Sequence, residues 1–387
     1  MKIAHISPDE KFIESIQWQF EKIFPGQNSF FVFLVKQIGS TKYVHAGKSV
    51  QLLADDAKGL KKILEEIKKY DLVIFHGLKY FQSQIVLKAA TSDNFVWFFW
   101  GGEIYDNYKA VGHKVLGKKT KEKFVGINAL KMLKRMVRPA YYLLRFKSMT
   151  PEASVLKAAK KIPYIGIIHE EEIEYLKQND FIGQSAKHVP MTYYPLEFIF
   201  KGIEDITITG KNILLGNSAS LTNNHLEAFE KIRLLNLEDR ELIVPLSYGD
   251  QKYATEICKT GKNLFGKSFS PIVDFMPLHE YNFKLSSCSI VIMNHYRQQA
   301  VGNILAMLWM GAKIYLNEGN TFYQYLKKQG ILVYSIDKDF VIETPEVLTG
   351  LTSMQIESNR KRLLNLISFE TTKERLREEL RNIVHGD

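Results

Sequence analysis

The stretch from Asn294 to Ile314 combines residue types that could hold an anion. Near its start are the polar residues Arg297, Gln298 and Gln299, beside the pair Gly302-Asn303. They stand between an apolar run predicted to be a strand, Ser289 to Met293, and a predicted apolar helix, Ile304 to Met310. The free N–H groups and the dipole of a helix N-terminus favour negative charge. We interpret this stretch as the part of a nucleotide-sugar site that binds the phosphate groups. The alternative is an ordinary β-α-β unit with a surface arginine.

A second group of polar residues follows two predicted strands in the first half of the chain. One strand ends at His76, and the next ends at Trp100, just before a double glycine. Glu103 and Asp106 are three apart at a predicted helix start, so either could act as a general base or hold sugar hydroxyls. The alternatives are that both carboxylates simply favour a helix N-terminus, and that His76 is a buried, hydrogen-bonded histidine.

The segment from Lys109 to Lys147 carries almost all of the net charge. It holds twelve Lys and Arg residues and one acid, Glu122, a net of +11 in a chain whose total is +10. Residues 125–146 alternate apolar and basic side chains, as an interfacial helix does, and Pro139 is predicted to divide them into two helices. The predicted membrane contacts are Lys118, Lys119, Lys134, Arg135 and Arg138. A solvated basic helical pair packed on the core is the alternative.

The elements that must position these residues alternate between apolar strands and amphipathic helices. Strands are predicted at 3–6, 30–35, 71–75, 95–100, 164–168, 212–215, 241–244, 289–293 and 313–316. Helices are predicted at 9–24, 53–69, 81–90, 152–160, 223–234, 250–259 and 277–286. This pattern is typical of parallel α/β sheets, in which ligands bind beyond the carboxyl ends of the strands.

The alternation restarts after a polar stretch from about Pro190 to Gly210, which predicts two α/β domains facing one another across a cleft. We expect a first domain at 1–195 with a basic helical insertion at about 109–148. A second domain is expected at 196–352, followed by a charged helical region at 353–387 that packs back on the first domain.

Several classes of protein and site are disfavoured. Cys258 and Cys288 are the only cysteines, which excludes a disulfide framework and a cysteine-based zinc site. The first residues lack the apolar core of a secretory signal, and no stretch has the apolar length of a spanning helix. The protein is therefore expected in the cytoplasm or on a membrane from its cytoplasmic side. No Walker A loop, N-terminal G-x-G-x-x-G, H-E-x-x-H or G-x-S-x-G motif is present. Asp337-Lys338-Asp339 matches a metal-binding D-x-D pattern but is predicted to be a turn. We therefore expect an enzyme that needs neither metal nor cofactor.

Most of the chain resembles one bacterial family, the TDP-N-acetylfucosamine:lipid II N-acetylfucosaminyltransferases (4-alpha-L-fucosyltransferase-like, glycosyltransferase family 56). The matching segments are 75–77, 98–105, 213–218 with Asn224-His225, 244–249, 297–303 and 316–317. The family usually has Asp where Glu103 stands, and the basic segment after Tyr105 is longer here than expected.

The resemblance implies a GT-B-type fold, a nucleotide-sugar donor (TDP- or other NDP-linked) and a polyprenyl-diphosphate-linked glycan acceptor at the cytoplasmic membrane face. In that setting the expected donor-site residues are Asn217, Ser218, Tyr248, Gly249, Arg297, Gln298, Gly302 and Asn303. Glu103 would deprotonate or orient the acceptor hydroxyl, with His76 beside it and Asp106 as a further candidate. A nucleic-acid-binding protein that uses the basic segment, and a non-catalytic scaffold of an envelope-glycan pathway, are the rival functions.

Overall fold

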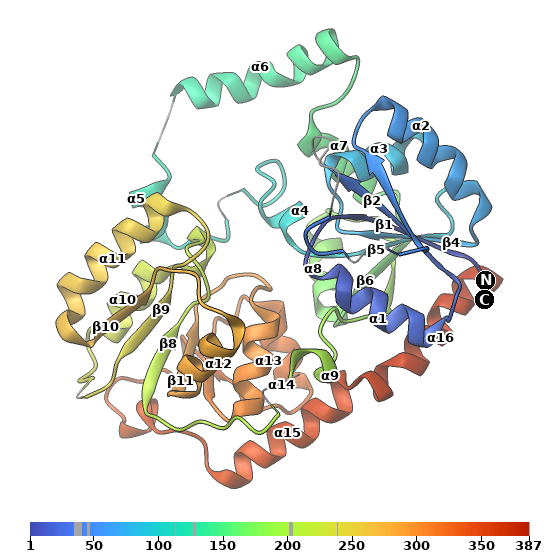
Figure 1. The fold of residues 1–387 in the computed structure, drawn as a ribbon. Helices are drawn as coiled ribbons and strands as arrows, with labels where there is room; N and C mark the ends of the chain where they lie inside the picture. Colours follow the sequence, from blue (N-terminus) through green and yellow to red (C-terminus); the bar gives the residue numbers. More distant parts are fainter. Residues whose placement is uncertain are drawn as a thin grey trace. The chain divides into compact units, whose positions relative to one another are not determined.

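The computed structural model describes residues 1–34, 41–44, 47–112, 114–126, 129–200, 204–237 and 239–386, with the backbone alone at 129–132 and 345. The chain forms two compact units. Unit 1 comprises Met1–Gly112, Asn128–Pro195 and Phe369–Asp387, and unit 2 comprises His113–Ile127 and Leu196–Ser368. Each unit contains one parallel sheet (Figure 1).

Unit 1 has a seven-stranded sheet of order β3-β2-β1-β4-β5-β6-β7. Its strands are β1 (Ile3–Pro8), β2 (Asn28–Leu34), β3 (Val50–Ala54), β4 (Leu72–His76), β5 (Phe95–Phe98), β6 (Tyr164–Ile167) and β7 (Lys187–Pro190). Its helices are α1 (Ile13–Ile23), α2 (Ala57–Glu66), α3 (Tyr80–Lys88), α4 (Gly102–Tyr105), α6 (Ala129–Phe146), α7 (Pro151–Ala159), α8 (Glu170–Gln178) and α16 (Phe369–His385). Helices α1 and α16 bury Phe20, Phe369 and Leu380 in one core with Ile3, Ile74 and Val96 of the strands.

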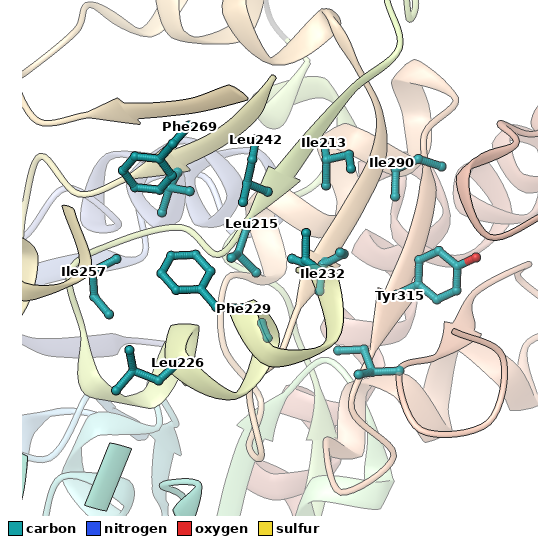
Figure 2. Packing of buried hydrophobic residues seen from close by; sticks show 14 of the residues in the cluster. Ile213, Leu215, Leu226, Phe229, Ile232, Leu242, Ile257, Phe269, Ile290 and Tyr315 are labelled. Atoms are coloured by element: carbon teal, nitrogen blue, oxygen red, sulfur yellow. The ribbon is translucent and has the colours of Figure 1, made fainter. Parts of the chain in front are cut away.

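Unit 2 repeats this order in six strands, β10-β9-β8-β11-β12-β13. They are β8 (Asn212–Leu215), β9 (Leu242–Pro245), β10 (Phe269–Ile272), β11 (Cys288–Met293), β12 (Lys313–Leu316) and β13 (Tyr334–Ser335). The helices are α5 (Lys118–Phe124), α9 (Leu196–Ile199), α10 (His225–Ile232), α11 (Gln251–Phe265), α12 (Leu278–Ser286), α13 (Val301–Met310), α14 (Thr321–Lys328) and α15 (Ser353–Ile367). Figure 2 shows Phe229, Ile232 and Ile257 of α10 and α11 packed on Ile213, Leu215 and Leu242 of the sheet.

Some predicted elements differ from the observed ones. Leu53 and Ala54, predicted to begin a helix, end β3 instead, because β2 offers them a parallel partner. The helix begins after Asp56, whose carboxylate accepts a hydrogen bond from Gly59 N at 2.8 Å. The predicted break at Pro139 is wrong, since α6 continues through it. The strands β3, β7, β10 and β13 and the helix α14 were not predicted, because their runs are short.

The expected basic insertion and the observed units also differ. Residues 113–127 belong to unit 2, because polar groups of α10 bind the segment that contains α5. Gly117 N donates to Asn224 Oδ1 at 2.8 Å, and Thr120 N donates to Glu227 Oε1 at 2.9 Å at the start of α5. At the other end of the chain, α15 packs on α13 in unit 2, while α16 packs on α1 and β7 in unit 1. Val35, the last residue of the strand predicted at 30–35, lies outside the described residues. So do residues 201–203 of the expected linker.

Candidate functional site

In unit 2 the strand order reverses between β8 and β11, and the loops after these strands meet at the carboxyl edge of the sheet. This is where ligands bind in open α/β sheets. Asn217 follows β8 and donates from Nδ2 to Tyr248 Oη, after β9, at 3.2 Å. Gln299, in the loop after β11, donates to Asn217 Oδ1 at 3.3 Å and accepts from Thr222 Oγ1 at 2.6 Å. We call Asn217, Thr222, Tyr248 and Gln299 the polar network of unit 2.

The helix N-terminus predicted to hold an anion is formed by α13. The residue before the helix, Ala300, has a φ of 58°, a strained conformation for a non-glycine residue that is common at functional sites. Because α13 begins at Val301, Gly302 and Asn303 lie in its first turn, where N–H groups have no partner within the helix. Arg297 is half-buried in the same loop and donates from Nη1 to Gln298 O at 3.2 Å. The arrangement can bind a phosphate group.

Two of the predicted nucleoside-lining residues serve the loops themselves. Ser218 is buried, and its Oγ accepts from Asn223 Nδ2 at 3.2 Å. Gly249 has a φ of 120°, and a Cβ there would lie 2.5 Å from Ala219 O. Ser218 thus stabilises the loop after β8, and Gly249 lets the loop after β9 lie close to it, so both residues shape this edge of the sheet.

Behind the polar network lie buried groups to which the sequence analysis gave no role. Asn223 Oδ1 accepts from Asn217 N at 2.9 Å and pairs with His295 Nε2 at 2.9 Å. Burial lowers the pKa of His295 well below its usual value, and lowers the pKa of His225 to about 3. A Cβ at Gly216 would lie 2.6 Å from both Asn223 Oδ1 and His225 Nε2. The signals in the sequence were the Asn224-His225 pair of the family resemblance and the position of His295 in the stretch from Asn294 to Ile314.

At the carboxyl edge of the unit 1 sheet, Glu103 is held by nitrogen donors. Its Oε1 accepts from Trp97 Nε1 and from Trp100 N, both at 3.3 Å. The residue is half-buried as a whole, but its Oε2 is inaccessible to solvent. Burial raises the pKa of Glu103 above 4.5, which suits a group that must accept a proton near neutral pH. Asp106 is exposed and follows the four-residue α4 as its C-cap, so the expectation that both carboxylates begin a helix is wrong.

His76 is the buried histidine of the alternative interpretation. Its side chain is 0% exposed, and its Nε2 pairs with His5 Nδ1 at 3.0 Å. On the other side its Nδ1 pairs with Tyr193 Oη at 3.1 Å. Burial lowers the pKa of His76 well below its usual value, so it stays neutral. A side chain without exposed surface cannot contact a substrate, so His76 can act only by positioning its neighbours.

Aromatic rings form a cluster beside Glu103 that the sequence did not single out. The rings of Phe12 and Trp100 lie 5.6 Å apart, and those of Phe12 and Tyr194 lie 5.7 Å apart. Tyr193 lies 6.1 Å from Trp100 and links this cluster to His76. Gly77, with a φ of 71°, permits the arrangement, because a Cβ there would lie 2.8 Å from the Trp100 ring. Trp100, Phe12 and Tyr194 are partly exposed, so they offer flat apolar surface at the edge of the sheet.

The five predicted membrane contacts lie on two elements. Lys118 and Lys119 belong to α5 of unit 2, where Lys119 pairs with Glu230 at 3.4 Å and Lys118 with Glu122 at 4.0 Å. Lys134, Arg135 and Arg138 belong to α6 of unit 1. Within the described ranges, no group of three or more His, Cys, Asp or Glu residues could hold a metal ion. Asp337–Asp339 form a turn, as predicted.

Comparison with known proteins gives a family match over part of the chain and identifies the fold. Residues 173–360 match the family described as 4-alpha-L-fucosyltransferase, glycosyl transferase group 56, in agreement with the resemblance seen in the sequence. The chain is similar to sucrose-phosphate synthase from Thermosynechococcus elongatus (TM-score 0.64, 10% identity, 100% of each chain). It is also similar to HepE of Anabaena in complex with UDP (TM-score 0.57, 9% identity, 99% of this chain and 100% of that one). A third is an alpha,alpha-trehalose-phosphate synthase from Burkholderia xenovorans in complex with glucose-6-phosphate (TM-score 0.57, 9% identity, 100% of each chain). The fold is GT-B.

Proposed function

We propose a donor and an acceptor for this chain, a glycosyltransferase of which residues 173–360 match glycosyl transferase group 56. The donor is a nucleotide-diphosphate sugar, linked to TDP or another NDP, whose sugar is either an N-acetylfucosamine-like deoxy-amino sugar or a fucose-like sugar. The acceptor is a polyprenyl-diphosphate-linked glycan in bacterial cell-envelope polysaccharide synthesis, of the enterobacterial common antigen type.

The donor assignment rests on one observation, the meeting of α13 and the polar network at the strand reversal of unit 2. The N–H groups of Gly302 and Asn303 and the guanidinium of Arg297 would stabilise charge on the departing diphosphate. Gln298 is in the same loop, and Asn217 and Tyr248 would contact the nucleoside. The UDP complex of HepE, a protein of the same fold, supports a nucleotide here. This set of donors needs neither a metal nor a cofactor.

For the acceptor we assign Glu103. As the acceptor oxygen forms its bond to the anomeric carbon, the bond from that carbon to the diphosphate oxygen breaks and Glu103 takes the hydroxyl proton. This description applies if the configuration inverts; if it is retained, Glu103 orients the hydroxyl. The neighbouring rings of Trp100, Phe12 and Tyr194 would pack on the apolar face of a sugar. Asp106, exposed beyond α4, is the second carboxylate available to bind acceptor hydroxyls.

A lipid-linked acceptor places the enzyme on the inner face of the cytoplasmic membrane, as a peripheral protein. Lys118, Lys119 and Lys134 are exposed and would contact anionic lipid headgroups. Because the acceptor cannot leave the membrane, an enzyme bound there meets it at a far higher local concentration.

A thermal-shift titration with TDP, UDP, GDP and their sugars tests the proposal. A ligand at one hundred times its Kd stabilises the folded state by about 2.7 kcal/mol, which should move the melting temperature by several degrees. We expect a nucleotide diphosphate to produce such a shift and Arg297→Ala to abolish it. Salt-sensitive binding of DNA or RNA without any response to nucleotides would instead support the nucleic-acid-binding alternative.

A further inference from the structure

Helix α6 exposes an apolar face along its length. The exposed fractions are 57% for Leu133, 77% for Met136, 55% for Val137, 53% for Tyr141, 65% for Leu143 and 83% for Leu144. These residues recur at three- and four-residue spacing, so they share one side of the helix. Contiguous exposed apolar surface of this kind usually marks an interaction site. Figure 1 shows α6 as a long helix in unit 1.

The opposite side of α6 is bound to unit 1 by its basic residues. Arg138 Nη1 lies 2.6 Å from Oε1 of Glu152 in α7, while its guanidinium also lies 5.3 Å from the ring of Tyr142 within α6. The guanidinium of Arg135 lies 4.7 Å from the Tyr108 ring. An ordinary surface helix buries its apolar side and exposes its charges. In α6 the charged side is anchored and the apolar side is presented outward.

The residues around the apolar face fit an anionic surface. Lys134, Arg145 and Lys147 are exposed, and the sequence has no Asp or Glu between Glu122 and Glu152. A nucleic acid would need the arginines to face outward and would gain little from exposed leucines. An interfacial helix, in contrast, requires an apolar face flanked by basic side chains. Among the described helices, none is long and apolar enough to cross a membrane.

We propose that α6 lies in the plane of an anionic bilayer and inserts the face formed by Leu133, Met136, Val137, Tyr141, Leu143 and Leu144. The exposed Lys134, Arg145 and Lys147 contact anionic headgroups, while Arg135 and Arg138 fix the helix to unit 1. Two of the residues first expected to touch lipid thus act as anchors inside the protein. The inference rests on the proposed function only in that the lipid-linked acceptor supplies the reason to bind a membrane.

Vesicle sedimentation of the full chain tests the insertion. The vesicles contain phosphatidylglycerol and phosphatidylethanolamine, or phosphatidylcholine alone as the uncharged comparison. We expect the double variant Met136→Ser/Leu144→Ser to lower the partition coefficient on phosphatidylglycerol vesicles at least about tenfold, because both side chains enter the bilayer. Lys134→Glu/Arg145→Glu should also reduce binding and abolish its salt dependence. The matched control is Met354→Ser/Leu364→Ser on α15, whose side chains are 84% and 46% exposed; it should bind like the wild type.

Three outcomes would overturn the proposal. The first is vesicle binding unchanged in Met136→Ser/Leu144→Ser. The second is a lipid-free dimer that dissociates in this variant during light scattering, which would make the face an interface between two copies. The third is a melting temperature several degrees lower without lipid, which would mean that the face packs within the protein.

The transfer assay separates this proposal from the proposed function. Activity on a short-chain, water-soluble acceptor should survive in the variant, whereas activity on vesicle-borne acceptor should fall. Transfer to neither acceptor by wild-type protein that binds vesicles would refute the function alone.

Discussion

The carboxyl edges of the two sheets are built on the same strand order but differ in what they expose. In unit 1 the polar groups face one another inside the fold: His5 and His76 are 0% exposed, and Glu103 Oε2 is inaccessible. In unit 2, Tyr248 is 61% exposed, and Asn217 and Gln299 reach the surface beside it. The buried histidines of unit 2 lie one layer deeper and support this network.

This difference is consistent with the roles proposed above for the two units. A surface network of amide and hydroxyl groups can exchange its internal hydrogen bonds for bonds to a ligand, which suits the binding of a nucleotide. A single carboxyl held in a low-dielectric environment can bind few ligand atoms, but its raised pKa suits proton transfer. Substitutions at Glu103, Arg297, the buried histidines and Asn217 test this distinction.

Glu103→Gln should lower kcat/KM by about 10²–10⁴-fold, the usual contribution of a general base. Because burial raises the pKa of Glu103 above 4.5, the acid limb of the wild-type pH profile should lie above that value. The protonated Glu103 contributes fully to the free energy of unfolding below about pH 4.5. This contribution is lost as the pH rises through the folded-state pKa, because the buried carboxyl then becomes charged. The variant should therefore be at least as stable as the wild type at pH 7, measured by its melting temperature.

Glu174→Gln on the exposed side of α8 is the matched control and should keep normal turnover. Near-normal kcat in Glu103→Gln would remove the base from the mechanism and would make the buried carboxyl of unit 1 a structural group.

Arg297→Ala should lower kcat by about 10²–10³-fold, as the loss of one preorganised charge-stabilising donor does. The reason is that the guanidinium would act on charge that grows as the diphosphate leaves. Steady-state kinetics with circular dichroism as the folding check measures the effect, and Lys267→Ala, an exposed cation of the same unit, is the control. Turnover equal to that of the wild type would show that Arg297 does not stabilise the diphosphate, and the assignment of the phosphate site to the loop after β11 would be wrong.

Acid should destabilise both units through their buried histidines. Burial lowers the pKa of His5 and of His225 to about 3, and those of His76 and His295 well below the usual value. Below about pH 6.5 the unfolded chain binds protons that the folded chain excludes, so stability falls by about 1.4 kcal/mol per pH unit for each such histidine.

Denaturant titrations between pH 7.5 and 5.5 measure this slope. His76→Gln and His295→Gln should each reduce it, and equally, because both side chains are fully buried. His279→Gln should leave it unchanged, since its side chain is 82% exposed. A smaller reduction in one unit than in the other would show that its histidine is protonated in the folded state.

Asn217→Ala should weaken nucleotide binding about threefold to tenfold with little change in kcat, the range expected for one or two neutral hydrogen bonds. Its side chain joins Tyr248 and Gln299, so its loss loosens the network without removing a charge. Isothermal titration calorimetry with the nucleotide measures the change, and Asn263→Ala, exposed on α11, is the control. A loss of more than a hundredfold would mean that the network is a rigid scaffold rather than a ligand surface.

Local pattern was sufficient for most of the framework. The apolar runs of β1, β4, β8 and β11 and the periodic faces of α1 and α10 predicted two α/β halves, because strand and helix periodicity are properties of neighbouring residues. The short strands β10 and β13 were missed, since a run of two to four residues has little periodicity. The helix at α13 was predicted three residues late, because a helical Gly-Asn pair is unusual.

Residue types and their positions at strand ends were enough to select Arg297, Asn217, Tyr248 and Glu103, and the charge of the segment from Lys109 to Lys147 could be read directly. Accessibility could not be read, because it depends on contacts between distant parts of the chain. His76 is buried by His5, 71 positions earlier, and by Tyr193, 117 positions later. The outward face of α6 was likewise decided by the tertiary contacts of Arg135 and Arg138, since an amphipathic pattern says that two sides differ but not which one the fold will cover.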